Sequence, residues 1–212
     1  MPSVPVLHLA LVIFSHCLVA FAIREFDQKA FKVLQVDQQP RNDGILQCTS
    51  ASTLRALLLQ LGIPEEDLKN PHEMAGITSD GCRVTGIDFR GQELHGTLPQ
   101  ELGELQELKK LDLSGTAVAG NLESLEKATK LKKLDLSGTA VAGNLKSLEK
   151  ATKLKKLDLR GTAVAGNLSV LLHFAKIKVV NLGGTRVHGS LSEAWRGGCP
   201  ILRSLTLSDA WQ

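Results

Sequence analysis

LKKLDLSGTAVAGNLESLEKATK, residues 108–130, is the first of three nearly identical segments in this chain. The second, residues 131–153, differs from it only in having Lys146 where the first has Glu123. The third, residues 154–176, keeps the first fifteen positions except for Arg160. A fixed period of this length predicts one supersecondary unit stacked on copies of itself, because a single unit cannot bury its apolar face alone.

Each unit has the spacing Leu-x-x-Leu-x-Leu-x-x-Thr-x-Val, which is typical of leucine-rich repeats. Leu111 and Leu113 alternate with polar residues, and this alternation predicts a strand with one buried face. Gly120-Asn121 predicts a turn, and residues 124–130 predict a short helix or irregular turn on the outer side. The predicted fold class is α/β: a leucine-rich repeat solenoid with a parallel, concave β-sheet and a helical N-terminal cap.

The array is predicted to cover residues 84–212, and its final strand to be Leu202–Leu207. Units start at residues 84, 108, 131, 154, 177 and 202. Threonines 116, 139, 162 and 185 share one position in their units, where a hydroxyl can satisfy backbone groups of the turn, so we expect a structural role. The sequence stops at Gln212 within a unit, which leaves three interpretations: a truncated product, an end-to-end self-association surface, or a tail that covers the edge.

The region before the array falls into two predicted parts. Residues 1–22 have an apolar run ending in Ala20-Phe21-Ala22, as in a secretory signal peptide, and the alternative is an uncleaved membrane anchor. Residues 23–83 predict a cap with helices over 52–61, before Gly62, and from Pro64. A chain without its signal peptide would have no membrane span and would be secreted or held at the cell surface.

Composition limits the function. The 212 residues have a net charge of +3, only 4% aromatic residues and no Tyr, so nucleic acid is not an expected partner. Of the four cysteines, Cys48 and Cys82 both lie in the predicted cap, so we expect them to form a disulfide. Cys199 is then free or pairs between molecules.

The run GCRVTGIDF, residues 81–89, followed by LHGTLPQELG, residues 94–103, resembles the cap junction and first repeat of plant-type extracellular leucine-rich repeat proteins. That group includes receptor-kinase ectodomains and polygalacturonase inhibitors. The chain departs from it in a wider spacing of the cap cysteines, in the lack of the usual cap Trp and in the absence of a kinase domain. The resemblance implies a curved solenoid that binds other molecules, and it names no ligand.

Side chains that alternate with the strand leucines are predicted to line the concave face in columns. The candidate binding residues are Arg90, Lys110, Asp112, Lys133, Asp135, Lys156, Asp158 and Arg160. Arg90 and Arg160 flank the most uniform units, and a guanidinium binds carboxylates bidentately, so these two are the first candidates for contact. The alternative is a solvated, charge-balanced face in which the lysine and aspartate columns neutralise each other without binding anything.

The sequence offers no catalytic grouping. Histidines 72, 95, 173 and 188 share no metal-ligand spacing, and no cofactor or metal is expected. Asn167-Leu168-Ser169 is a glycosylation sequon. We therefore predict a non-catalytic recognition module for a protein partner, which could bear carbohydrate. The alternatives are a secreted inhibitor of an extracellular enzyme and the truncated ectodomain of a receptor-like kinase.

Overall fold

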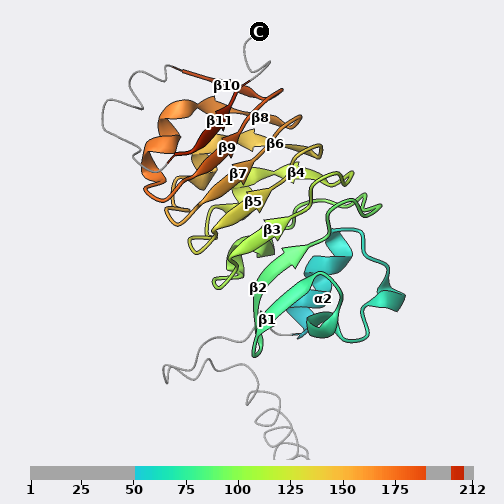
Figure 1. Ribbon diagram of the computed structural model, residues 1–212. Coiled ribbons are helices and arrows are strands. Elements are labelled where there is room, and N and C mark those ends of the chain that lie inside the picture. The colour runs from blue at the N-terminus through green and yellow to red at the C-terminus, as the bar shows by residue number, and fades with distance from the viewer. Residues whose placement is uncertain (1–50, 190–201, 208–212) are drawn as a thin grey trace, which may run out of the picture. The chain divides into compact units, whose positions relative to one another are not determined.

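The computed structural model describes residues 51–189 and 202–207, which belong to one compact unit, Gln47–Gln212. A seven-stranded sheet runs through this unit (Figure 1). In spatial order its strands are β1 (Ile77–Asp80), β2 (Arg83–Asp88), β3 (Lys110–Asp112), β5 (Lys133–Asp135), β7 (Lys156–Asp158), β9 (Val179–Asn181) and β11 (Ser204–Thr206). Every pair from β2 onward is parallel, and only β1 and β2 are antiparallel. The predicted final strand is therefore confirmed.

Strand register follows the sequence period. Leu111, Leu134 and Leu157 lie directly opposite one another on β3, β5 and β7, and all three are fully buried. One residue further along, Asp112, Asp135 and Asp158 are likewise in register. Because side chains alternate between the two faces of a strand, one face of the sheet packs on the leucine core and the other carries the polar columns. The stacked-repeat prediction is confirmed.

A second sheet, which the sequence did not predict, lies on the other side of the leucine core (Figure 1). Its strands, in spatial order, are β10 (Arg186–His188), β8 (Ala163–Asn167), β6 (Ala140–Asn144) and β4 (Ala119–Asn121). The prediction of a turn at Gly120-Asn121 was wrong, since both residues lie in β4. Gly143 in β6 shows why glycine occurs there: its φ is 113°, and a Cβ would lie 2.2 Å from the Asn121 side-chain oxygen.

Outer turns close each repeat as 3₁₀-helices. They are η3 (Gln100–Glu104), η4 (Leu122–Leu125), η5 (Leu145–Leu148) and η6 (Leu168–His173). The asparagine before each of the last three accepts a hydrogen bond at its side-chain oxygen from the backbone N–H two residues later, at 2.8–3.1 Å. This capping starts each turn earlier than the sequence predicted.

The threonine column is structural, as predicted. All four threonine side chains are buried, and each hydroxyl donates to a backbone carbonyl three residues earlier, at 2.6–2.8 Å. These bonds satisfy polar groups where each chain turns away from the sheet.

The described part of the predicted cap contains one α-helix, α2 (Ala51–Gln60), which agrees with the predicted helix and buries Leu54, Leu57 and Leu58. The predicted helix from Pro64 is a short 3₁₀ turn, η1 (Glu65–Asp67), and a second such turn, η2 (Pro71–Glu73), follows it. The cap ends in β1, an unpredicted strand that extends the sheet beyond the first repeat. The predicted signal peptide, Cys48 and Cys199 lie outside the described residues.

Candidate functional site

The candidate site is the polar face, by which we mean the sheet face formed by Lys110, Asp112, Ser114 and their equivalents on the neighbouring strands. Three consecutive strands, β3, β5 and β7, have the same sequence, Lys-Leu-Asp, in register. Neighbouring strands lie about 4.8 Å apart, so identical charges are stacked at close range. Whether the fold tolerates this stacking depends on the side chains that hydrogen-bond to each charge.

The four aspartates 88, 112, 135 and 158, which we call the aspartate row, are less exposed than the sequence predicted. Asp112, Asp135 and Asp158 are only 1%, 6% and 3% exposed. The alternative interpretation, a solvated face, is therefore wrong for these three carboxylates. Each accepts a hydrogen bond from a side chain of its own repeat, and Asp112 and Asp135 also accept one from a lysine of the next repeat. A buried charge must be paired and hydrogen-bonded, and these carboxylates meet that requirement.

Each carboxylate in the middle of the row is held from two directions. Ser114 Oγ donates to Asp112 Oδ1 at 2.7 Å, and Lys133 Nζ, from the next repeat, donates to Asp112 Oδ2 at 2.9 Å. The pattern repeats at Asp135, with Ser137 Oγ at 2.8 Å and Lys156 Nζ at 2.7 Å. The predicted neutralisation of lysine by aspartate is therefore present, and it joins successive repeats.

These contacts change the acidity of the row. Burial raises the pKa of Asp112, but the hydrogen bonds from Ser114 and Lys133 outweigh that effect and hold the pKa below its usual range. At Asp88 the Arg90 hydrogen bond is the largest influence on the pKa, burial opposes it, and Lys110 adds to the lowering. Both groups are therefore carboxylates at neutral pH.

The two arginines differ in how much of their hydrogen-bonding capacity is used. Arg90 makes a bidentate pair with Asp88, from Nε at 2.9 Å and from Nη2 at 2.6 Å. The side chain of Arg160 donates to Asp158 only through Nε, at 3.0 Å, and its terminal nitrogens have no hydrogen bond to any described residue. Both side chains are more than half exposed, at 60% and 57%.

The regular pattern ends at β9. Val179 stands where the earlier strands have lysine, and Asn181 continues the aspartate row. The amide Nδ2 of Asn181 lies 3.5 Å from Asp158 Oδ2, and its Oδ1 is the one buried side-chain acceptor without a partner among the described residues. The reason lies two residues further on, where Gly183 has no side chain to donate as Ser114 and Ser137 do. The polar face therefore changes character between β7 and β9.

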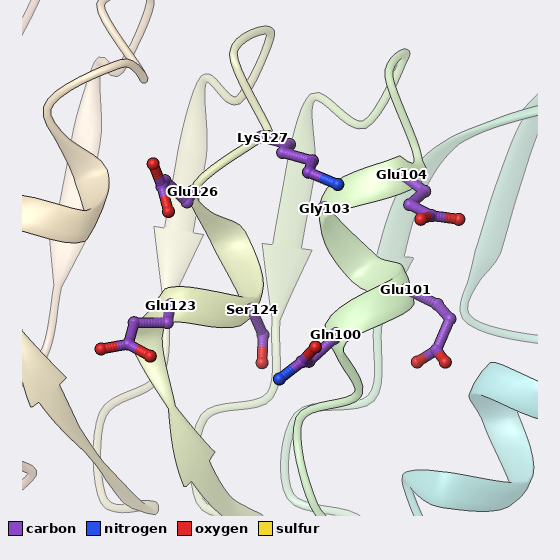
Figure 2. Close-up of a pocket in the computed structure, with 8 residues that line it drawn as sticks. All are labelled: Gln100, Glu101, Gly103, Glu104, Glu123, Ser124, Glu126 and Lys127. Carbon is purple, nitrogen blue, oxygen red and sulfur yellow. The ribbon is translucent and has the colours of Figure 1, made fainter.

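The structure also has an acidic hollow of about 350 Å³ between η3 and η4. Its lining includes Glu101, Glu104, Glu123 and Glu126, with Lys127 among them. Figure 2 shows the carboxylates of Glu101 and Glu104 on one side and those of Glu123 and Glu126 on the other, pointing apart rather than toward a common point. Within residues 51–189 and 202–207, no group of His, Cys, Asp or Glu is placed to hold a metal ion.

The remaining predicted site residues are separate from the polar face. Asn167 is exposed and caps η6 through its oxygen, which leaves glycosylation at its nitrogen a prediction. Cys82 forms a disulfide, and the other cysteines of the sequence lie outside the described residues, so the pairing with Cys48 also stays a prediction. No described helix has the length and apolar character needed to cross a bilayer.

The repeat register, the parallel pairing of strands from one repeat to the next and the buried leucine columns together define a leucine-rich repeat solenoid. No protein-family model matches the sequence, and no curated protein matches it. Solved structures do match. The leucine-rich repeat ectodomain of the receptor kinase SOBIR1 from Arabidopsis thaliana is similar with a TM-score of 0.65 and 23% identity, over 77% of this chain and 95% of that one.

Two further ectodomains, both in complexes, have the same fold. The Arabidopsis thaliana receptor kinase GASSHO1/SCHENGEN3 in complex with CASPARIAN STRIP INTEGRITY FACTOR 2 gives a TM-score of 0.66 and 21% identity, over 76% of this chain and 21% of that one. The Arabidopsis receptor kinase HAESA in complex with an IDA peptide hormone ligand gives a TM-score of 0.56 and 21% identity, over 74% of this chain and 32% of that one. This chain therefore spans a third or less of those two structures, and nearly all of the SOBIR1 ectodomain. The chain has the fold of plant extracellular leucine-rich repeat ectodomains, as the sequence resemblance implied.

Proposed function

We propose that this protein is a non-catalytic recognition module, secreted or at the cell surface, whose polar face binds an extended segment of a protein partner. The observation that carries the proposal is the change between β7 and β9. There Arg160 has unused donors beside a uniform array of lysines whose carboxylate partners are already engaged. The complexes of GASSHO1/SCHENGEN3 and HAESA support it, since ectodomains of the same fold hold protein or peptide ligands.

The chemistry of the face suggests what the segment carries. Lys133 and Lys156 are half-buried and bonded to aspartates, so they can contribute positive electrostatic potential to the face but few free hydrogen-bond donors. Arg160 keeps two terminal nitrogens, and a guanidinium fork fits a carboxylate. We therefore propose an acidic side chain or a C-terminal carboxylate of the partner at Arg160, with Arg90 as a weaker contact because Asp88 already occupies its fork.

The test is affinity for a partner recovered from extracellular extract with the full chain as bait. Arg160→Ala should weaken binding about tenfold or more, as expected for an arginine that anchors an interface. Arg90→Ala should weaken it less. Arg160→Lys is the matched variant: it keeps the charge and loses the fork, and it should behave like Arg160→Ala if bidentate bonding matters. Unchanged affinity in both alanine variants would refute this site, and turnover of a substrate by the purified protein would refute the functional class.

A further inference from the structure

A second charged surface lies along the edge where the chain enters each parallel strand. The residue just before the strand of the seven-stranded sheet is basic in every repeat from the second onward. These residues are Lys109, Lys132, Lys155, Lys178 and Arg203, which we call the basic ladder. Since the amino ends of parallel strands meet at one edge of a sheet, the sequence period alone places these cations in a row.

Backbone hydrogen bonds establish that the row is continuous. The N–H of Lys132 donates to the carbonyl of Lys109, that of Lys155 to Lys132, and that of Lys178 to Lys155, each at 2.8 Å. The N–H of Arg203 donates to the carbonyl of Lys178 at 2.7 Å. The ladder therefore has one cation per strand, at intervals of about 4.8 Å and over a span of roughly 20 Å.

The basic ladder lacks the internal partners that the aspartate row has. None of its members lies within 4.0 Å of a described carboxylate. Lys132, Lys155 and Arg203 are exposed, and Lys109 and Lys178 are half-buried. Two more exposed lysines without a described acid, Lys153 and Lys176, each lie two residues before a ladder residue, at the end of the preceding repeat. Folding therefore leaves this positive charge available to a ligand.

The positive charge of the ladder also affects a neighbouring carboxyl group, that of Glu107. Lys130 Nζ donates to Glu107 Oε1 at 2.5 Å, and this hydrogen bond is the largest influence that lowers the pKa of Glu107. Burial raises the pKa of Glu107, whereas the charges of Arg83 and of the ladder's Lys109 lower it further. At the opposite edge of the sheet, where the strands end, three successive repeats have Ser-Gly-Thr-Ala, Ser-Gly-Thr-Ala and Arg-Gly-Thr-Ala, so Arg160 is the one charged residue in these three runs. In these repeats the edge where the strands begin therefore has more positive charge than the edge where they end.

We propose that the basic ladder binds a linear acidic polysaccharide, one with a carboxylate or sulfate on each sugar. A uniform row of cations suits a polymer whose charge repeats uniformly, and lysine acts as a point charge that requires no particular ligand shape. A nucleic acid would be expected to use stacking aromatics, and the chain is only 4% aromatic with no Tyr. An acidic protein bound along the ladder would be expected to have an apolar anchor there, and neither of the exposed large apolar residues among those described, Leu59 and Leu172, belongs to the ladder.

The experiment titrates the full chain with alginate oligosaccharides long enough to span the roughly 20 Å of the ladder. Neutral dextran oligosaccharides of equal length are the ligand control. We expect calorimetric binding of alginate that weakens steeply as salt rises, because exposed charges are screened beyond about 10 Å at 0.1 M ionic strength. The triple variant Lys132→Gln, Lys155→Gln, Lys178→Gln should bind roughly tenfold more weakly. It should fold as the wild type does, since none of the three joins a described ion pair.

A second triple variant separates the ladder from net charge. Lys69→Gln, Lys146→Gln, Arg186→Gln removes the same charge from exposed positions outside the ladder and should keep wild-type affinity within about twofold. Equal losses in the two variants would overturn the proposal, because only overall charge would then matter. Absence of alginate binding by the wild type would also overturn it. So would tighter binding of polyglutamate or single-stranded DNA at equal charge, which would assign the surface to another class of partner.

Discussion

The aspartate row and the basic ladder are two stacks of like charge with the same spacing and opposite environments. In the row, each central carboxylate is buried and accepts hydrogen bonds from its own repeat and from the next. In the ladder, the cations are exposed or half-buried and have no described carboxylate within 4.0 Å. The same repeat period gives both stacks, so a regular column of charge does not by itself indicate either structure or binding.

The energies show what each stack requires. Two like charges about 4.8 Å apart repel by roughly 1 kcal/mol in water and by several times more in a protein interior. The aspartate row lies in the less polar setting and is tolerated because lysine and serine donors are closer to each carboxylate than the next carboxylate is. The basic ladder relies on water and salt to screen its repulsion, which a polyanionic ligand would do more effectively.

The largest expected effect comes from breaking the aspartate row. Asp112→Ala removes an acceptor that Ser114 and Lys133 share, and it should lower the free energy of unfolding by about 2–3 kcal/mol. This loss of stability is smaller than the largest losses seen when a buried ion pair is broken, because the Lys133 side chain is 30% exposed and water can solvate it. Urea denaturation followed by circular dichroism measures it.

Asp112→Asn is the matched control for that substitution. It keeps the shape and an oxygen acceptor for Ser114 but loses the charge that Lys133 pairs with, so the cost should be about half as large. If Asp112→Ala instead raised stability, repulsion along the row would exceed its hydrogen bonding, and the row would destabilise the fold.

Periodicity predicted the strand register, the threonine column and the pairing of lysine with aspartate, because each depends on which residue recurs. It did not predict that Asp112 is buried. The side chains that bond Asp112, Ser114 and Lys133 of the next repeat, are polar residues that the sequence pattern alone places on an exposed face. The second sheet was also missed, because Ala-Gly-Asn is a weak strand sequence and becomes extended only when stacked. The orphan oxygen of Asn181 could have been found from Gly183, the one position in its column without a donor side chain.

Acid should weaken the row before it affects the ladder. The pKa values of Asp88 and Asp112 are lowered in the folded protein, so the unfolded chain takes up protons first as the pH falls. The stabilisation is therefore present above the ordinary aspartate pKa of about 3.9 and is lost progressively below it. Unfolding free energies measured between about pH 6 and pH 2 should rise with pH, and Asp112→Asn should flatten that slope. Gln substitutions at Lys132, Lys155 and Lys178 should leave that slope unchanged, because lysine does not titrate in this range and none of the three bonds a described carboxylate.

The smallest effect gives the sharpest comparison, because one of two adjacent lysines bonds the aspartate row and the other is a member of the basic ladder. Lys133 bonds the buried Asp112, whereas Lys132 belongs to the ladder and has no described carboxylate partner. Lys133→Gln should therefore lower the unfolding free energy by about 1 kcal/mol, and Lys132→Gln should change it by less than about 0.5 kcal/mol or raise it slightly by relieving repulsion. Raising the salt concentration should remove the Lys132→Gln effect and reduce the Lys133→Gln effect only in part, since buried pairs are screened less. Equal losses from the two substitutions would mean that the row and the ladder do not differ energetically, and the proposal that only the ladder is left for a ligand would lose its physical basis.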